Sequence, residues 1–154
     1  MPRSHRSRAR QQKPERHDRC RHRHRRARHR PCQAHRQKVL ATDIDPIAIT
    51  TTIENARDND VGELIETLVA TGLDHPAIAS HAPYDLVVAN ILAGPLVELA
   101  PGMGVITQAG GTAILSGILN TQADGVIEAY QRSGFTLRDH LKRKDWTTLV
   151  LEKR

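Results

Sequence analysis

The chain has 154 residues, 38% of them hydrophobic, and a formal net charge of +6, a size that suits one domain. No apolar run approaches the roughly 18 residues of a membrane span, and no apolar segment follows the basic start, as a secretory signal requires. The two cysteines provide no disulfide framework, so we expect a soluble intracellular protein.

The first 38 residues differ in composition from the rest of the chain. They hold 13 Arg and 2 Lys against 2 acidic residues, a net +13, whereas the remainder has 8 basic and 15 acidic residues, a net −7. Residues 1–37 have too few apolar side chains to offset the entropy of ordering a backbone, so we expect them to be disordered. A folded domain is expected over residues 38–154.

By itself, this basic segment allows two functions that need no enzyme. A polycation binds nucleic acid by neutralising phosphates, here without specificity and with strong salt dependence, because no aromatic side chain is available for base stacking. A metal site is less well supported, because the candidate ligands lack the usual zinc spacing. These ligands are Cys20, His22, His24, Cys32 and His35.

The folded part begins with a predicted strand and helix. Val39–Thr42 is a short β-prone run that ends at Asp43. Asp45 then offers a carboxylate for a helix N-cap, and Pro46 suits the first helical position. Apolar residues recur at helical spacing from there to about Asp58, which predicts an amphipathic helix.

The next segments predict a weak strand, a loop and a strong strand. Glu66–Ala70 is the weak strand candidate, and Gly72–Pro83 is predicted to be a loop. Asp85–Asn90 is apolar on both faces and bounded by turn residues. A strand buried on both faces belongs inside a parallel sheet.

A helix and another buried strand should follow. Gly94-Pro95 opens the helical stretch, which we expect to break near Pro101-Gly102. Gly110-Gly111 predicts a turn, and Thr112–Ser116 a buried strand. The expected inner face of the helix consists of Leu96, Leu99 and Val105.

The C-terminal part predicts one helix and a hairpin. Asn120–Ser133 is amphipathic, with Val126, Ile127 and Tyr130 facing inward, and Gly134 lies where a C-cap glycine would stand. Phe135–Leu141 and Trp146–Leu151 alternate like an antiparallel pair. Strands and helices that alternate and end in a hairpin predict a doubly wound α/β sheet with an antiparallel edge.

Several of these segments resemble a bacterial methyltransferase family, PrmA, whose members methylate the eleventh protein of the large ribosomal subunit. The resemblance is carried by Lys38–Pro46 (KVLATDIDP), Asn55-Ala56 and above all Asp85–Pro101 (DLVVANILAGPLVELAP), and it covers about Lys38 to Glu152. Further matching pieces are Leu115–Leu119, Gln122-Ala123, Tyr130, Gly134-Phe135 and Trp146. The resemblance implies a cytoplasmic class I enzyme that uses S-adenosyl-L-methionine and has a seven-stranded, Rossmann-like sheet with an antiparallel last strand.

The resemblance assigns Asp43 to the cofactor site. It matches the acidic residue that accepts hydrogen bonds from both ribose hydroxyls of the cofactor, a task that suits the two oxygens of a carboxylate. The alternative is that Asp43 is only a turn or cap residue. Asp45 is better explained as the N-cap, because no further oxygen ligand accompanies the pair to hold a metal.

Asn90, Ile91 and Leu92 complete the predicted cofactor site. Asn90 lies at the carboxyl end of a strand, where open α/β sheets bind ligands. The family's corresponding Asn touches the cofactor near the reacting methyl, and its amide could also orient the incoming amine. An Asx-turn is the alternative for Asn90, and ordinary helix-start packing is the alternative for Ile91 and Leu92. No residue stands out as a catalytic base.

Two parts of the family's pattern cannot be read in this sequence. The family has a central first strand followed by Asp-x-Gly-x-Gly-x-Gly, and an upstream domain that docks the ribosomal protein, but this chain has no glycine before Gly62. Without the first strand, we expect two open strand edges, a crevice with one wall missing and weak cofactor binding. The sequence therefore predicts a truncated methyltransferase domain with impaired or no activity.

The codons of the basic segment suggest where the missing motif went. Read one nucleotide later, Arg and His codons become mainly Gly, Ala, Val, Asp, Thr and Ile codons. Arg16–Arg30 can then read Val-Met-Ile-Asp-Ala-Gly-Thr-Gly-Thr-Gly-Val-Leu-Ala-Ile-Ala, an apolar strand followed by a triple-glycine loop. Our hypothesis is that residues before about Lys38 are an out-of-frame translation of that motif.

Overall fold

The computed structural model describes residues 37–154, so the expectations for the basic segment lie outside the described residues. The strands are β1 (Val39–Asp43), β2 (Ile65–Val69), β3 (Tyr84–Asn90), β4 (Thr107–Leu119), β5 (Phe135–Arg143) and β6 (Trp146–Lys153). The helices are α2 (Pro46–Asp58), α3 (Pro76–His81), α4 (Ala93–Ile106) and α5 (Ala123–Arg132), with 3-10 turns η1 (Gly62–Leu64) and η2 (Asn120–Gln122). Within this part of the chain, no helix is long and apolar enough to cross a membrane.

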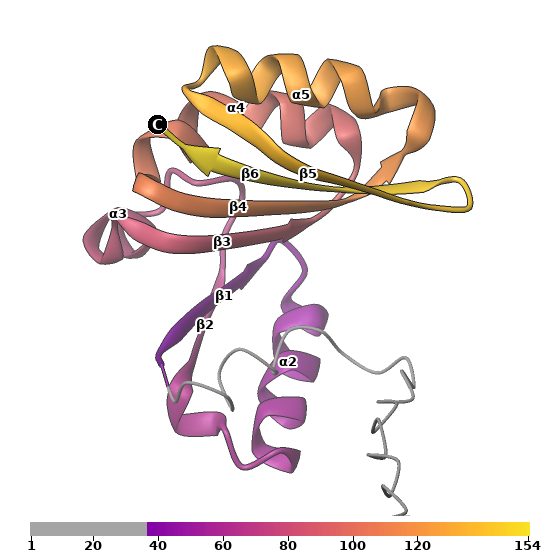
Figure 1. Ribbon diagram of the computed structural model, residues 1–154. Coiled ribbons are helices and arrows are strands. Elements are labelled where there is room, and N and C mark those ends of the chain that lie inside the picture. The colour runs from indigo at the N-terminus through magenta and orange to yellow at the C-terminus, as the bar shows by residue number, and fades with distance from the viewer. Residues whose placement is uncertain (1–36) are drawn as a thin grey trace, which may run out of the picture.

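The strands form two sheets (Figure 1). β1 pairs with β2 in parallel, and the second sheet has the order β3-β4-β6-β5. β3 and β4 are parallel, whereas β6 is antiparallel to both of its neighbours. The α/β alternation and the final hairpin are confirmed, but the antiparallel strand is not at an edge. The hairpin folds back so that β6 lies between β4 and β5, and β5 becomes the edge strand.

The division between the sheets leaves two strand edges open. In residues 37–154, β1 pairs only with β2, and β3 pairs only with β4. This agrees with the expected loss of a central strand. It also corrects one expectation for β3, which is not buried on both faces. Val87 and Ala89 pack against the core, but Val88 on the opposite face is 59% exposed because, among the described residues, helices α4 and α5 cover only the other face of the sheet.

The first strand and helix form as predicted. The side chain of Asp45 accepts a hydrogen bond from the Ile47 amide at 2.8 Å, and Pro46 occupies the first turn of α2. This contact satisfies one of the amides that a helix start leaves without a partner. β2 also lies within one residue of its predicted start and end.

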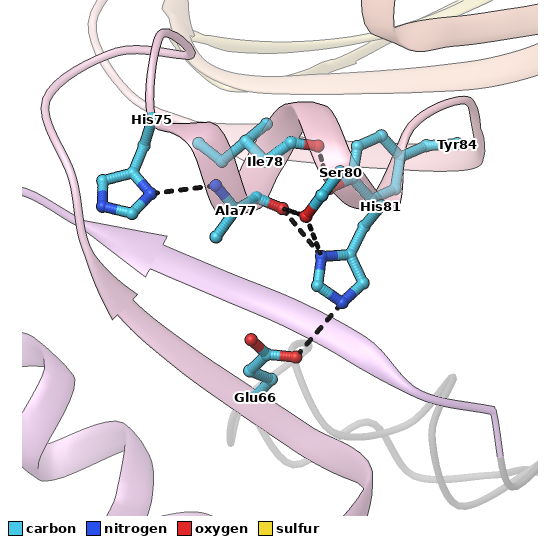
Figure 2. Close-up of polar contacts among 7 residues, drawn as sticks. All are labelled: Glu66, His75, Ala77, Ile78, Ser80, His81 and Tyr84. Carbon is cyan, nitrogen blue, oxygen red and sulfur yellow. Dashed lines mark hydrogen bonds and ion pairs between the residues drawn. The ribbon is translucent and has the colours of Figure 1, made fainter.

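The predicted loop at Gly72–Pro83 is wrong, because it contains α3. His75 caps this helix by accepting a hydrogen bond from the Ala77 amide at 3.2 Å, and Ile78 is buried. Figure 2 shows how α3 is attached to its neighbours. His81 of α3 lies 3.4 Å from the Glu66 carboxylate of β2, and the Tyr84 hydroxyl of β3 donates to the Ile78 carbonyl at 2.8 Å.

Helix α4 corrects two further expectations. It does not break at Pro101, which lies on the exposed side of the helix, where water can bind the carbonyl that loses its amide partner. Val105 is 82% exposed instead of facing inward. It follows Leu96 by nine residues, which places it about 180° around the helix. The predictions for Leu96, which is fully buried, and Leu99, which packs against the core, are confirmed. The other buried residues of the helix are Ala93, Ala100, Met103 and Ile106.

Gly110-Gly111 lies within β4 and does not form a turn. The β3–β4 register shifts between Tyr84 and Leu86, so the glycine pair bulges out of the ladder, and Gly110 has a φ of 77°. The remaining C-terminal predictions are close to the structure. α5 begins three residues late, after η2, with Val126 and Tyr130 buried and Ile127 half-buried, and Gly134 follows its end with a φ of 86°.

The core lies between the four-stranded sheet and helices α4 and α5, which cover one of its faces (Figure 1). Leu115 of β4 and Leu149 of β6 come from neighbouring strands and are fully buried. The rings of Tyr130 and Phe135 meet in a tilted contact with centroids 5.4 Å apart. This packing holds the carboxyl ends of β3 and β4 in place.

Candidate functional site

An open pocket of about 460 Å³ lies where β3 and β4 end. The last parallel pair of these strands is Asn90 opposite Ser116, so the pocket lies at the carboxyl edge of the parallel strands. Open α/β sheets bind their ligands at this edge. The residues that line the pocket are Asn90, Ile91, Leu92, Ser116, Gly117 and Trp146.

Three of the four predicted cofactor residues meet in this pocket. Asn90 is the last residue of β3, and Ile91 and Leu92 form the link to α4. Leu92 is the N-cap of α4, so it also occupies the helix start that the alternative explanation expected. Its side chain is nevertheless 71% exposed, so it is not packed as an ordinary core residue. It therefore presents apolar surface beside the pocket.

The carboxamide of Asn90 has no hydrogen-bond partner within residues 37–154, and the Asx-turn contact of the alternative explanation is not made there. Its Oδ1 atom instead lies against Gly117, 3.0 Å from the position that a Cβ on that glycine would take. An amide has two donors and one acceptor oxygen. Asn90 therefore brings both kinds of hydrogen-bonding group to an otherwise largely apolar pocket wall.

Asp43 is not among the residues that line this pocket. It ends β1 in the other sheet, and its Oδ1 accepts a hydrogen bond from the Asp45 amide at 3.0 Å. This is the turn contact that the alternative explanation expected. The second carboxylate oxygen makes no polar contact within the part of the chain that the structure describes. The structure thus leaves one oxygen of Asp43 available, and its cofactor role stays a prediction.

Three residues of the pocket were not selected from the sequence. Ser116 and Gly117 come from β4, and Trp146 from the start of β6. A glycine inside a strand often marks a bulge or a close backbone approach, so Gly117 carried a usable signal. Trp146 is the only tryptophan of the chain and is 53% exposed. Its ring adds aromatic surface to the pocket wall.

Among residues 37–154, the residues that line the pocket include no ionisable side chain. The pKa values that clearly depart from their ordinary range belong to Tyr84, Tyr130, Arg138 and Glu152, and none of these residues lines the pocket. Among residues 37–154, no group of three or more potential ligands could hold a metal ion, and the Asp43–Asp45 pair is no exception. The described lining thus offers neutral polar groups, among them the Asn90 carboxamide and the Ser116 hydroxyl, within apolar walls.

Comparison with known proteins identifies relatives for most of the chain. The family model described as ribosomal protein L11 methyltransferase (PrmA) matches residues 33–154. The chain is 51% identical over 114 residues to the ribosomal protein L11 methyltransferases of Brucella suis and Brucella melitensis, and 50% identical over 114 residues to that of Mesorhizobium japonicum. These matches cover 74% of this chain and 39–40% of the relatives, so the chain spans about two fifths of their length.

Solved structures agree with the fold. The ribosomal protein L11 methylase from Lactobacillus delbrueckii subsp. bulgaricus superposes with a TM-score of 0.69 at 30% identity, over 76% of this chain and 59% of that chain. A methyltransferase-like protein from Thermoplasma acidophilum superposes with a TM-score of 0.62 at 16% identity, over 76% of this chain and 57% of that chain. The class I methyltransferase fold predicted from the sequence is thereby confirmed.

Proposed function

Because the chain belongs to the ribosomal protein L11 methyltransferase (PrmA) family, we propose that it carries part of the active site of an S-adenosyl-L-methionine-dependent protein N-methyltransferase. The proposed substrate is the large-subunit ribosomal protein L11, with lysine and α-amino groups as acceptors, and the proposed location is the cytoplasm. No finding favours the non-enzymatic alternative of nucleic-acid binding through the basic segment, which lies outside the described residues.

The observation that supports this proposal best is the position of Asn90. Its carboxamide has no partner in the described part of the chain and stands at the carboxyl edge of two parallel strands, beside an open pocket. Ile91 and Leu92 give that pocket exposed apolar walls. A polar group that fixes orientation within apolar walls is the usual composition of a small-molecule site.

The pocket residues and Asp43 suit two parts of S-adenosyl-L-methionine, the reacting methyl and the ribose. The bound S-adenosyl-L-methionine would supply an electrophilic methyl group on a sulfonium. Asn90 would bind near that methyl and orient the incoming amine, while Ile91 and Leu92 would exclude water. The free oxygen of Asp43 suits a ribose hydroxyl, because a carboxylate accepts such a donor strongly. A ligand that reaches both Asp43 and the pocket has to cross from one sheet to the other.

The transfer itself needs alignment more than acid–base catalysis. A bound S-adenosyl-L-methionine would supply the methyl group, and the acceptor would have to be a neutral amine whose proton passes to solvent after the transfer. Because the described lining of the pocket includes no ionisable side chain, we expect the amine to arrive deprotonated. We therefore expect the rate to rise with pH as the acceptor amine loses its proton. The ordinary pKa of that amine is about 7.7 for an α-amino group and about 10.4 for lysine.

The test compares three chains: this one, one in which residues 16–30 carry the shifted-frame reading, and the Asn90→Ala variant of that corrected chain. Each is incubated with S-adenosyl-L-methionine and purified L11, and methylation of L11 is followed by mass spectrometry. We expect the corrected chain to bind the cofactor and to methylate L11 slowly without the family's docking domain, this chain to show little or no methylation, and the variant to lose at least about tenfold. A corrected chain that folds but neither binds the cofactor nor methylates L11 would refute the proposal.

A further inference from the structure

The end of β4 contains a one-residue bulge beside the pocket. Leu115 pairs with Leu149 of β6, but Ile118 pairs with Thr147, so Ser116 and Gly117 together face the single residue Thr148. The two hydroxyls at this point, on Ser116 and Thr148, lie 3.2 Å apart. A bulge of this kind bends the strand and changes the direction of its side chains.

Gly117 is required in this bulge for two separate reasons. Its φ of 83° lies in the left-handed region, which side chains other than glycine's rarely adopt. A Cβ on Gly117 would also stand 2.7 Å from the Ile91 carbonyl oxygen and 3.0 Å from Asn90 Oδ1. The first of these atoms belongs to the backbone and cannot move cheaply. The main chain of β4 therefore contacts the very residues that begin the pocket wall.

The same strand provides an internal comparison. Gly110 also has a positive φ, 77°, but a Cβ there would meet no atom within 4 Å. A side chain at Gly110 would therefore cost only backbone strain, whereas a side chain at Gly117 would add a collision with Asn90 and Ile91. Comparing the alanine variants at the two positions therefore separates the effect of the collision at Gly117 from the effect of backbone strain, which both positions share.

We propose that Gly117 is a positioning residue, whose missing side chain leaves the space beside β4 in which the Asn90 carboxamide lies. Within residues 37–154 the carboxamide has no hydrogen bond that could hold it there against a side chain on β4. The consequence for methyl transfer rests on the proposed function of the pocket. The effect on the Asn90 rotamer does not depend on that function.

The first test measures the rotamer in the absence of ligand, by NMR, in the wild-type chain and in the variants Gly117→Ala and Gly110→Ala. We expect one staggered χ1 for Asn90 in the wild type and in Gly110→Ala, with a nuclear Overhauser contact between Gly117 Hα and the Asn90 side chain. In Gly117→Ala the rotamer should change or become a mixture. An unchanged rotamer in Gly117→Ala, or a wild-type Asn90 that rotates freely without that contact, would overturn the proposal.

The second test uses Trp146, whose fluorescence reports on the same pocket. S-adenosyl-L-methionine is titrated into the frame-corrected chain and its two glycine variants. We expect the dissociation constant to rise about tenfold or more in Gly117→Ala and to stay within about threefold in Gly110→Ala. Equal effects of the two variants would contradict a positioning role.

The two tests separate the two proposals. If the corrected chain does not bind S-adenosyl-L-methionine, the proposed function fails, and the rotamer comparison still decides the role of Gly117. If Gly117→Ala does not fold, the Overhauser contact and the χ1 of Asn90 in the wild-type chain decide the role of Gly117. The stability of the double variant Gly117→Ala/Asn90→Ala provides a second measurement. Removing Oδ1 should restore part of the stability lost on adding a methyl to Gly117, and a double variant no more stable than Gly117→Ala would count against the contact.

Discussion

The two sheets of this protein are packed very differently. The four-stranded sheet and helices α4 and α5 contain every large side chain that is fully buried in the described part of the chain, among them Leu96, Leu115, Tyr130 and Leu149. The region of β1, α2 and β2 buries only a few residues, and Ile47 of α2 is 74% exposed. The first region therefore contains most of the core, and the second contributes partly buried residues at its margin, among them Leu40 and Leu68.

This difference bears directly on the proposed site. Asn90, Ile91, Leu92 and Trp146 stand at the margin of the well-packed region, so their backbone positions are fixed by its core. Asp43 belongs to the other region, where the strand edge toward β3 is open. We infer that the pocket around Asn90 is preformed, and that Asp43 needs additional structure to hold it in place for its proposed role.

Truncation of a core side chain should give the largest effect. Leu115→Ala removes a fully buried side chain from β4 and should lower the free energy of unfolding by about 2–5 kcal/mol. Ile53→Ala, at a partly exposed position of α2, should cost less than about 1 kcal/mol. Urea denaturation of both variants measures the difference. Equal losses would show that the two regions do not differ as described.

The buried phenol of Tyr130 should make the core region sensitive to alkali. Burial raises the pKa of Tyr130 well above its ordinary value of 10.0, and its hydroxyl has no partner in the described structure. In the unfolded chain the Tyr130 phenol ionises near pH 10, whereas in the folded chain it stays neutral. The contribution of Tyr130 to the free energy of unfolding is therefore fully present below pH 10. It then falls by up to about 1.4 kcal/mol per pH unit above it.

Tyr130→Phe should remove most of this alkaline loss and leave stability near pH 7 equal or higher, because the buried hydroxyl is unpaired. Tyr84→Phe is the matched control. It leaves Tyr130 in place, so this variant should still lose most of the same stability above pH 10. Thermal denaturation between pH 8 and pH 11 decides the matter. An alkaline loss that is identical in the wild type and Tyr130→Phe would assign the sensitivity to another group.

The N-cap of α2 should matter less and act locally. Asp45→Ala removes the hydrogen bond to the Ile47 amide and should cost about 1 kcal/mol. Since α2 lies outside the well-packed region, hydrogen exchange should accelerate in the amides of α2 and stay unchanged in β4. Faster exchange in both elements would mean that the two regions unfold as one unit.

The smallest effect should come from the exposed ion pair on the hairpin. Arg138 donates to both oxygens of Glu152 at 2.7 and 2.8 Å, and these hydrogen bonds hold the pKa of Glu152 below its ordinary value. Its stabilising contribution is therefore present above the unfolded pKa and is lost as pH falls through the folded one. Arg138→Gln should raise the pKa of Glu152 in an NMR titration while the core stays intact. A pKa that does not move would show that the pair is not formed in solution.

The sequence predicted the elements whose signals are local. β1, α2 and the β5–β6 hairpin follow from a cap, a proline and strict alternation, and their observed bounds lie close to the predicted ones. α3 was missed because six residues with a single buried isoleucine give no periodic pattern. The position of β6 inside the sheet depends on which edge the hairpin meets, and a linear pattern does not contain that information.

For the site, too, the sequence predicted the residues whose signal is local. Asn90, Ile91 and Leu92 are consecutive, so one motif identified all three. Trp146 reaches the pocket only because β6 pairs with β4, a contact between segments far apart in the chain. The open face of β3 was misjudged because an apolar run does not reveal whether a helix packs on each face of the strand.

The most direct measurement of the proposed site is a titration of S-adenosyl-L-methionine followed by ¹H–¹⁵N NMR, in this chain and in the frame-corrected one. In the corrected chain we expect the largest shift changes at Asn90, Ile91, Gly117 and the Trp146 indole, with Asp43 also affected, and much weaker binding in this chain. Saturable binding that leaves these pocket signals unmoved would contradict the assignment.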